Sequence, residues 1–397
     1  MTDRQAYVAF NLTDKVGFAT VSELVARAGS VVAAWEAYPK KVSRTGGEVD
    51  WEGEFKLAEK YGVKIVTPAD ADYPRQLREA PGAPLCLYVK GDMKALAKPM
   101  IAMIGTRRAT TYSITPRAHL LRTVNLDTYY AQDIDQRQVQ SGYNFELIRE
   151  TMPAVEIFTA DELNHLSDLR TGFVKKMAEY PAGAYRREME RLGIDLSWKS
   201  AQIEGNTYTL LETETLLKDL QEAKGKKHEE AVMLLNHKSA LKAILERPEW
   251  FERISIAKIE DIHAVLTEGL GVERNLRHAS IGITGTKYRP LDVESQIREA
   301  VEDMCTLING KQEPYEKALL ALLLVAYIQP FMDGNKRTSR LIANAILIAA
   351  KCCPLSFRTV DANDYRAALL LFYEQNNISA FKRMYLEQVE FALREYF

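Results

Sequence analysis

Residues 327–340, YIQPFMDGNKRTSR, join a turn to a cluster of cations. An apolar run breaks at Pro330, and the residues after Gly334 follow the spacing of an amphipathic helix. The first backbone N–H groups of a helix have no partner within the helix, so they can bind an anion at its N-terminus. Three cations follow the turn at spacings that a helix brings together: Lys336, Arg337 and Arg340. The stretch therefore predicts a phosphate-binding loop.

The other side chains of this turn suit a nucleotide. Gly334 lets backbone approach a ligand, and the Asn335 side chain can hold the shape of the loop. Asp333 is out of place among phosphates unless it holds Mg²⁺, which commonly takes one carboxylate together with phosphate oxygens. Phe331 is the apolar side chain that can anchor the loop in a core. The alternative is an ordinary helix N-terminus that Asp333 caps, with a solvated basic face.

Gln329 is the residue that does not fit transfer chemistry. It stands just before Pro330, where a phosphate-transfer loop would call for a base. A glutamine amide can form hydrogen bonds and so keep the loop in shape, but it cannot accept a proton near neutral pH. The sequence thus supports nucleotide binding more firmly than turnover.

The elements that must position these residues are mainly helical. Long amphipathic patterns dominate from about residue 115 onward, and residues 318–328 form an apolar run typical of a buried core helix. One exception, residues 279–290, is β-rich around a central glycine and predicts a hairpin. Before residue 113, short β-rich runs occur at 62–67 and 84–91, and the apolar stretch 98–104 predicts a strand that enters a glycine.

We therefore expect a mainly α fold: a helical bundle with a β-hairpin flap, preceded by a small truncated α/β segment. The expected parts are residues 1–113, a helical region at 114–225 and a core at 226–397. The change of pattern near residues 112–117 marks the first boundary.

The bulk composition excludes several classes of protein. A net charge of −2 with 27% charged residues argues against a general polyanion binder, so any basic site must be local. The four cysteines lack the spacing of a zinc site and fit a reducing compartment. The apolar run 318–328 is about half the length of a membrane span, and the N-terminus has no signal-peptide pattern. We expect a cytoplasmic protein with no membrane contact.

Several motifs in the second half of the chain occur together in one known family. The segment QPFMDGNKRTSR resembles the Fic-domain signature HPFx(D/E)GN(G/K)RxxR at every position but the first. SAQIEGN, residues 200–206, resembles the Fic inhibitory motif (S/T)xxxE(G/N). IGITGTKYRP resembles the flap that positions the target, and DANDYRAALLLFYEQNN resembles the late Fic helices. The resemblance covers about residues 140–397.

The resemblance implies a mostly helical enzyme that transfers AMP from ATP to a Ser, Thr or Tyr hydroxyl of a target protein. By position, Asp333 would bind Mg²⁺. The implied nucleotide-binding residues are Phe331, the anion hole of Gly334, Asn335 and Lys336, and the outer-phosphate ligands Arg337 and Arg340. The implied flap residues are Ile283, Thr284, Gly285 and Thr286. Lys336 replaces the commoner glycine. The GNKR form also occurs in the Doc branch, which phosphorylates its targets, so AMP transfer and phosphate transfer both stay open.

The inhibitory motif consists of Ser200, Glu204 and Gly205. A helix that ends at Gly205 would leave the Glu204 carboxylate at its tip, where it can pair with Arg340. That pair would remove the guanidinium expected to hold the γ-phosphate, and ATP would bind in a non-reactive pose. The alternative is an ordinary helix end with a glycine stop.

In the family, a histidine at the position of Gln329 takes the proton from the target hydroxyl. Gln329 leaves three interpretations: a natural nucleotide-binding pseudoenzyme or regulator, an engineered or damaged copy of an active enzyme, or a different base. Among the six histidines, His278 lies just before the flap and is the one candidate for that base.

Residues 1–113 resemble the start of DNA-processing protein A through the segments DADYPRQL, PLCLYVKGD and IAMIGTRRATTYS. Gly105, Arg107 and Tyr112 match the family's turn, whereas Ser113 replaces its last glycine. The remaining strands of that fold are missing, so association with single-stranded DNA is an alternative that we do not expect. The expected partners are ATP and an unidentified target protein. Self-modification and a homodimer, both frequent among Fic proteins, stay open.

Overall fold

The computed structural model describes the chain except for residues 45, 79–82 and 91–115. It divides into two compact units, Met1–Ile104 and Gly105–Phe397, and each is described by itself. The strand predicted at 98–104, and Gly105, Arg107, Tyr112 and Ser113 of the resembling turn, lie outside the described residues. Within the described parts of the chain, no helix is both long enough and apolar enough to cross a membrane.

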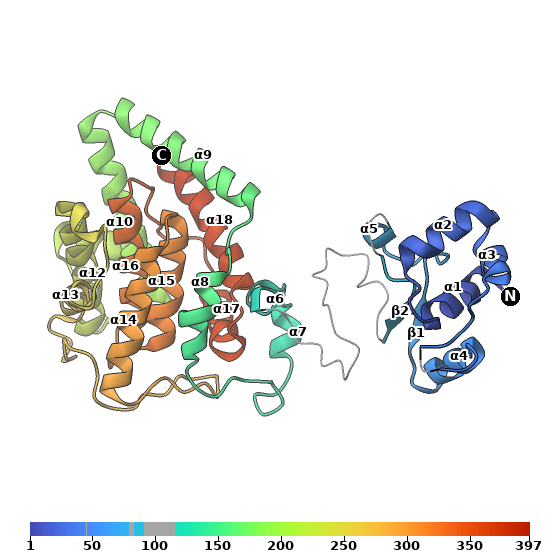
Figure 1. Cartoon of the computed structure of the whole chain (residues 1–397). Coiled ribbons are helices and arrows are strands. Elements are labelled where there is room, and N and C mark those ends of the chain that lie inside the picture. The colour runs from blue at the N-terminus through green and yellow to red at the C-terminus, as the bar shows by residue number, and fades with distance from the viewer. Residues whose placement is uncertain (45, 79–82, 91–115) are drawn as a thin grey trace. The chain divides into compact units, whose positions relative to one another are not determined.

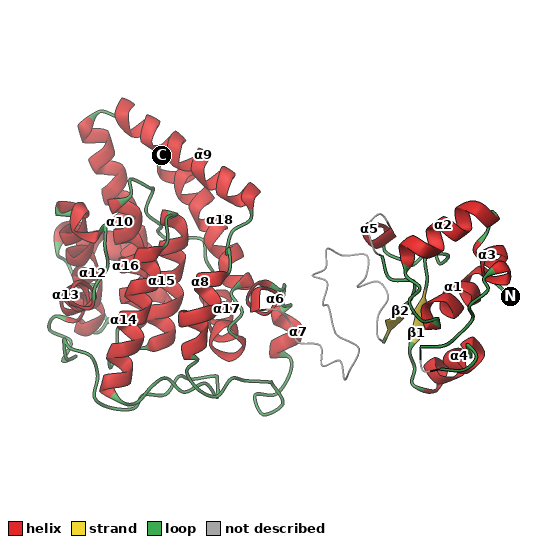
Figure 2. Ribbon diagram, in the orientation of Figure 1, coloured by secondary structure: helices red, strands yellow, loops and turns green. Residues whose placement is uncertain are grey.

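The first unit is a small helical domain with one short sheet (Figures 1 and 2). Phe10 and Trp35 meet edge to face in its core, with ring centroids 5.0 Å apart. The β-rich runs at 62–67 and 84–91 do contain strands, which pair antiparallel with Lys64 opposite Val89. The elements are α1 (Asp3–Leu12), α2 (Phe18–Ala28), α3 (Val31–Ala37), α4 (Trp51–Lys60), β1 (Lys64–Val66), α5 (Arg75–Arg78) and β2 (Leu87–Val89).

The second unit is a bundle of helices, which confirms the mainly α fold class (Figure 2). A π-helical turn spans Leu147–Thr151, and a 3₁₀ turn spans Pro248–Phe251. The α-helices are α6 (Pro116–Leu121), α7 (Leu126–Tyr130), α8 (Met152–Ala154), α9 (Ala160–Glu179), α10 (Ala182–Ile203), α11 (Leu210–Asp219), α12 (His228–Glu246), α13 (Ile256–Thr267), α14 (Glu294–Gly310), α15 (Pro314–Ile328), α16 (Asn335–Ala349), α17 (Ala362–Gln375) and α18 (Ser379–Tyr396).

Helix α15 forms the centre of this bundle. Every residue of its apolar run 318–328 is fully buried, as expected of a helix that is hydrophobic on all sides. Helix α16 packs beside it and is also buried along most of its length (Figure 1). The short loop between these two helices is therefore held by the best-packed part of the molecule, and this loop carries the predicted phosphate site.

Helix α10 brings the inhibitory motif to the same region. It is 22 residues long, packs against α12 and α16, and is buried at its C-terminal end, where Ser200 and Ala201 have no exposed surface. The helix ends at Glu204, and Gly205 takes a φ of +96°, which suits a glycine stop. The sequence-based helix end is therefore found where the motif placed it.

The flap, residues 279–291, forms a turn but not the strands of the predicted hairpin. Gly285 has a φ of +88° within the turn, yet no strand is present in this segment. Its second arm pairs elsewhere, because the Arg289 N–H donates to the Ser141 carbonyl at 3.0 Å and Arg289 bridges Gly142. The second arm thus pairs with residues 141–142, and the two arms of the flap do not pair with each other as strands.

Candidate functional site

The loop between α15 and α16 has two left-handed residues at its ends. Gln329 ends α15 with a φ of 53°, and Gly334 precedes α16 with a φ of +79°. A side chain at position 334 would be strained in this backbone conformation, and its Cβ would lie 3.3 Å from the Thr267 side chain. Glycine thus lets the chain turn sharply into α16, whose first N–H groups face the cleft described below.

Asn335 closes the loop on itself. Its Oδ1 accepts from the Phe331 N–H at 2.8 Å, while its Nδ2 donates to the Phe331 carbonyl at 2.7 Å. The same Nδ2 also donates to Gln329 Oε1 at 3.0 Å, and Gln329 Nε2 donates to the Ala326 carbonyl at 2.6 Å. Both polar atoms of the Gln329 amide are therefore engaged in loop structure.

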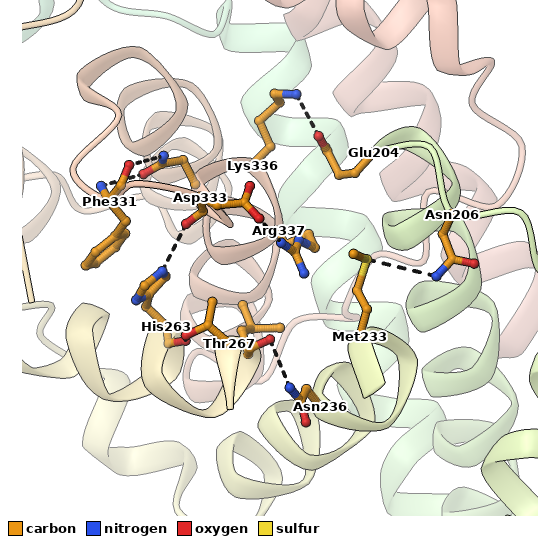
Figure 3. Close-up of polar contacts among 12 residues, drawn as sticks. Glu204, Asn206, Met233, Asn236, His263, Thr267, Phe331, Asp333, Lys336 and Arg337 are labelled. Carbon is orange, nitrogen blue, oxygen red and sulfur yellow. Dashed lines mark hydrogen bonds and ion pairs between the residues drawn. The ribbon is translucent and has the colours of Figure 1, made fainter. Parts of the chain in front are cut away.

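Phe331 lies behind the loop and not in the cleft. Its ring is fully buried and stacks on His263 of α13, with centroids 3.6 Å apart and an interplanar angle of 4°. His263 Nε2 donates to the Asp333 carbonyl at 3.0 Å (Figure 3). Burial lowers the pKa of His263, which keeps the ring neutral. The expectation that Phe331 binds nucleotide is corrected: its large apolar ring anchors the loop in the core instead.

Arg337 is a buried cation with an unused donor. Its side chain is 2% exposed, and Nη2 donates to Asp333 Oδ2 at 2.9 Å. Nη1 is buried and has no protein partner. Burial lowers the pKa of Arg337, but an arginine remains charged at neutral pH. A buried guanidinium N–H without a partner, beside the cleft, is a donor available to an anion.

Arg340 is completely buried and bound to the inhibitory motif. Its Nε donates to Ser200 Oγ at 2.8 Å, and its Nη2 donates to the Ser200 carbonyl at 2.8 Å and to Glu204 Oε1 at 2.9 Å. Ser200 Oγ in turn lies 2.8 Å from Nε2 of His237, whose pKa is lowered to about 3 by burial. His237 is therefore neutral, and its ring shares a hydrogen bond with the Ser200 hydroxyl.

Glu204 bridges two cations of the loop. Its second oxygen, Oε2, accepts from Lys336 Nζ at 2.6 Å (Figure 3). Burial by itself would raise the pKa of Glu204, but the charges of Arg340 and Lys336 outweigh it and hold the pKa below its usual value. The predicted pairing with Arg340 is present, and the contact with Lys336 is an addition that the motif did not indicate.

A cleft of about 570 Å³ opens above this arrangement. The anion loop, the start of α16, the flap and α17 all contribute to its wall. Its lining residues are Tyr130, Glu204, Ile281, Gly282, Ile283, Thr284, Gln329, Met332, Asp333, Gly334, Asn335, Lys336, Arg337, Asn363, Arg366, Ala367, Leu369, Leu370 and Tyr373.

The cleft contains part of the predicted site. Two predicted flap residues, Ile283 and Thr284, line it, whereas Gly285 and Thr286 do not. Arg340, Ser200 and Gly205 are also outside its wall, since Glu204 stands between Arg340 and the open space. His278 is exposed and bonds Glu294 at 3.0 Å outside the wall, so this structure gives no support to it as the base.

Sequence reasoning missed the α7 and α17 side chains at the cleft, among them Tyr130, Asn363, Arg366 and Tyr373. It also missed His237 and His263, because both lie on ordinary amphipathic helices. Only their burial in the structure marks these two histidines as part of the site.

The donor set suits one Mg²⁺ bound mainly through a ligand. Asp333 lines the cleft with a side chain that is 68% exposed, and Arg337 takes only one of its oxygens. Among the residues that the structure describes, no group of three or more His, Cys, Asp and Glu side chains could hold a metal by itself. Such a site fits a magnesium ion that takes one protein carboxylate and several phosphate oxygens.

The ionised Glu204 should stabilise the fold over a defined pH range. Because its folded pKa is lowered, its contribution is fully present above the unfolded pKa and is lost as pH falls through the folded pKa. We expect Glu204→Gln to reduce the free energy of unfolding by about 1.5–3 kcal/mol at pH 7. The difference should stay constant from about pH 8 to 5.5 and shrink only below about pH 4.5.

Urea unfolding at several pH values measures this difference. Glu190→Gln, which neutralises an exposed carboxylate on the same helix, is the control. A difference that already disappears between pH 8 and 5.5 would contradict the lowered pKa.

Comparisons with known proteins agree with this geometry. Residues 253–347 match the model of the Fic/DOC family, and residues 64–127 match that of DNA recombination-mediator protein A. The "Protein adenylyltransferase Fic" of Nematostella vectensis is 29% identical over 233 residues, which cover 55% of this chain and 51% of that protein. The "Protein adenylyltransferase fic-1" of Caenorhabditis briggsae is 28% identical over 227 residues, covering 55% and 44%. The chain thus spans about half the length of these relatives.

Two solved structures show the same fold. A variant of Fic-1 from Caenorhabditis elegans superposes with a TM-score of 0.50 and 23% identity over 62% of this chain and 74% of that one. A Fic family protein from Desulfovibrio desulfuricans gives a TM-score of 0.50 and 21% identity over 60% and 75%. Residues 253–347 of the second unit are therefore similar in sequence to the Fic/DOC family, and the unit shares the fold of these two Fic proteins.

Proposed function

We propose that the chain is a Fic-type protein adenylyltransferase that binds ATP and Mg²⁺ in the cleft beside α16. Its reaction would transfer AMP to a Ser, Thr or Tyr hydroxyl of a target protein. Glu204 inhibits it, and Gln329 impairs it because it replaces the proton acceptor. The observation that carries the proposal is the double contact of the Glu204 carboxylate with Arg340 and Lys336, at 2.9 and 2.6 Å. An acid from α10 lies among the cations where an anionic ligand would bind.

The residues of the loop have separate tasks in this proposal. The first N–H groups of α16, the unused Nη1 of Arg337 and the Lys336 ammonium bind phosphate oxygens. Asp333 would hold Mg²⁺, whose charge would offset that of the phosphates. The flap residues Ile283 and Thr284 line the same cleft as the loop and hold the target near the α-phosphate.

Inhibition follows from competition for the cations. A ligand whose outer phosphate binds Nη2 of Arg340 must displace the Glu204 carboxylate, because that carboxylate accepts from Nη2. AMP, which lacks outer phosphates, meets no such competition. The contact of Glu204 with Arg340, called the latch below, therefore weakens binding of the triphosphate and leaves binding of the nucleoside unchanged.

Replacing Glu204 with glycine should raise affinity for Mg·ATP by at least about 10-fold, the value of one charge-assisted hydrogen bond. The gain should be much smaller for AMP. Isothermal titration calorimetry with ATP, ADP and AMP measures both. Glu190→Gly, at an exposed position of the same helix, controls for lost charge and added glycine. Equal affinities of the original chain and Glu204→Gly for ATP would rule out the latch.

A second function, a nucleotide-binding pseudoenzyme, is favoured by one observation. Gln329 uses both polar atoms of its amide within the loop, so the binding geometry is complete without a base. The two functions differ in whether label moves to protein. A chain with a histidine at position 329 should transfer label from α-labelled ATP if AMP is transferred, and from γ-labelled ATP if phosphate is transferred.

A further inference from the structure

The flap over the cleft lacks pairing of its own. Among the described backbone hydrogen bonds, none joins its first arm, residues 279–283, to its second arm, residues 286–291. The Tyr288 N–H bonds the Thr286 hydroxyl at 3.1 Å, and the Arg289 N–H bonds Ser141. An irregular segment of this length with so few bonds would ordinarily be mobile. Its position must come from contacts outside itself.

Arg277 ties the base of the flap to the anion loop. Its guanidinium is fully buried, with Nε donating to the Gln329 carbonyl at 2.7 Å and Nη1 to the Ala279 carbonyl at 2.7 Å. Nη2 donates to the Leu291 carbonyl. One side chain therefore joins both ends of the flap to the last carbonyl of α15. Among the described residues no carboxylate lies within ion-pair distance of Arg277, and three backbone carbonyls accept its donors.

Arg137 holds the other end of the flap. Its Nη2 donates to the carbonyl of Gly285, in the turn, at 3.2 Å. Its Nη1 pairs with the fully buried carboxylate of Glu374 on α17 at 3.2 Å, and the guanidinium lies 5.1 Å from the ring centre of Tyr130. The turn is thus connected to the core through a buried ion pair.

We propose that Arg277 and Arg137 are positioning residues: two guanidinium groups, in place of strand pairing, hold the flap over the cleft together with the buried Tyr288, whose hydroxyl donates to the Tyr327 carbonyl at 2.9 Å. Arg277 sets the separation between flap and loop because it bonds both, and Arg137 sets the tilt of the turn. This placement determines where a chain lying on the flap meets the ligand in the cleft. That last consequence rests on the proposed function. The attachment of the flap by Arg277 and Arg137, called the clasp below, does not rest on it.

A spin label at the flap turn tests the clasp without any activity. The four cysteines Cys86, Cys305, Cys352 and Cys353 are buried, so a nitroxide should label Thr284→Cys, at an exposed position, selectively. We expect a restricted spectrum in the parent, and a mobile component in both Arg277→Met and Arg137→Lys. The lysine keeps a cation beside Glu374 but cannot reach Gly285 at the same time. A label at Val174→Cys, on α9, should be unaffected.

Arg149→Met is the matched control, since Arg149 is an arginine with partly exposed ion pairs to Glu299 and Asp303. Thermal melts followed by circular dichroism show whether each variant is folded. If Arg277→Met does not fold, Arg277→Lys replaces it. Unchanged spectra at position 284 in folded Arg277 and Arg137 variants would overturn the proposal.

The effect on transfer separates this inference from the proposed function. In a chain that carries Glu204→Gly and Gln329→His, Arg277→Met should lower kcat by about 10²-fold, the usual cost of misplacing a reactant by about 1 Å. The KM for ATP should change by less than about threefold, because the phosphate-binding side chains are not altered. If the parent transfers no label, the proposed function fails, but the spin-label result still decides whether the clasp exists.

Discussion

Restoring a histidine at position 329 in a chain that also carries Glu204→Gly should raise AMP transfer by about 10²–10⁴-fold over Glu204→Gly alone. A Ser or Thr hydroxyl is a poor nucleophile, and glutamine cannot take its proton. Position 329 lines the cleft and is set by the left-handed end of α15. The gain should therefore come from one side chain, without repair of the loop.

The surroundings should also select the useful tautomer of that histidine. The Ala326 carbonyl, which now accepts from Gln329 Nε2 at 2.6 Å, would accept from the N–H of one imidazole nitrogen. The other nitrogen would then be free to accept the hydroxyl proton. Asn335 would lose its bond to position 329 but keep both of its bonds to Phe331, so the loop should retain its shape.

Radiolabel from α-labelled ATP on protein, separated by gel, measures the transfer, and label on the chain itself would report self-modification. Gln329→His alone should stay weak, because Glu204 still holds Arg340. Gln329→Asn with Glu204→Gly is the matched control, with an amide and no base. Strong labelling by Glu204→Gly alone would mean that another group is the base. A silent double variant that binds ATP would exclude AMP transfer as the chemistry.

Phe331→Ala should destabilise the second unit by about 3–5 kcal/mol, because it empties a fully buried aromatic site and removes the partner of His263. The loop should lose its anchor at the same time. We expect the affinity for Mg·ATP in the Glu204→Gly background to fall by more than about 10-fold, even where the protein is still folded.

Urea unfolding and calorimetric titration give the two quantities. Phe173→Ala on α9 removes a ring of the same kind from the same core and should cost comparable stability, yet leave ATP affinity unchanged. Phe331→Leu keeps much of the apolar volume. Its losses of stability and of ATP affinity should lie between those of the unaltered chain and those of Phe331→Ala. If Phe173→Ala and Phe331→Ala weaken ATP binding equally, the loss reflects global stability and not the loop.

The sequence was most informative where structure depends on near neighbours. The turn at Gly334, the buried run 318–328 and the helix stop at Gly205 follow from local rules of backbone and periodicity, and all three are present. The helix signal was strong because the apolar spacing persists over many residues. The contact of Glu204 with Arg340 joins residues 136 positions apart, and only the motif resemblance pointed to it.

The rest of the site depends on which side of a packed element a residue faces. The apolar character of Phe331 suggested an anchor in the core, whereas the resemblance placed it among the nucleotide-binding residues, and in the structure its ring stacks on His263 in the core. Arg277 and Arg137 were overlooked because single arginines in polar segments are usually solvated, whereas here both are buried, Arg277 on backbone carbonyls and Arg137 on the Glu374 carboxylate. The hairpin failed for a related reason: β-rich composition does not specify the partner, and the second arm pairs with residues 141–142.

Ser200 presents its carbonyl at the last turn of α10, where the Glu204 N–H has turned to Ala201 instead. Carbonyls at the end of a helix need an external donor, and Arg340 supplies it from 140 positions away. The arginine is therefore a C-terminal cap as well as a ligand for anions. A phosphate that binds this arginine removes the cap from α10. Ligand binding and fraying of the helix end are therefore coupled in one equilibrium. Heat, denaturant or a protease that acts on that helix end would change affinity for the ligand without altering the anion loop itself.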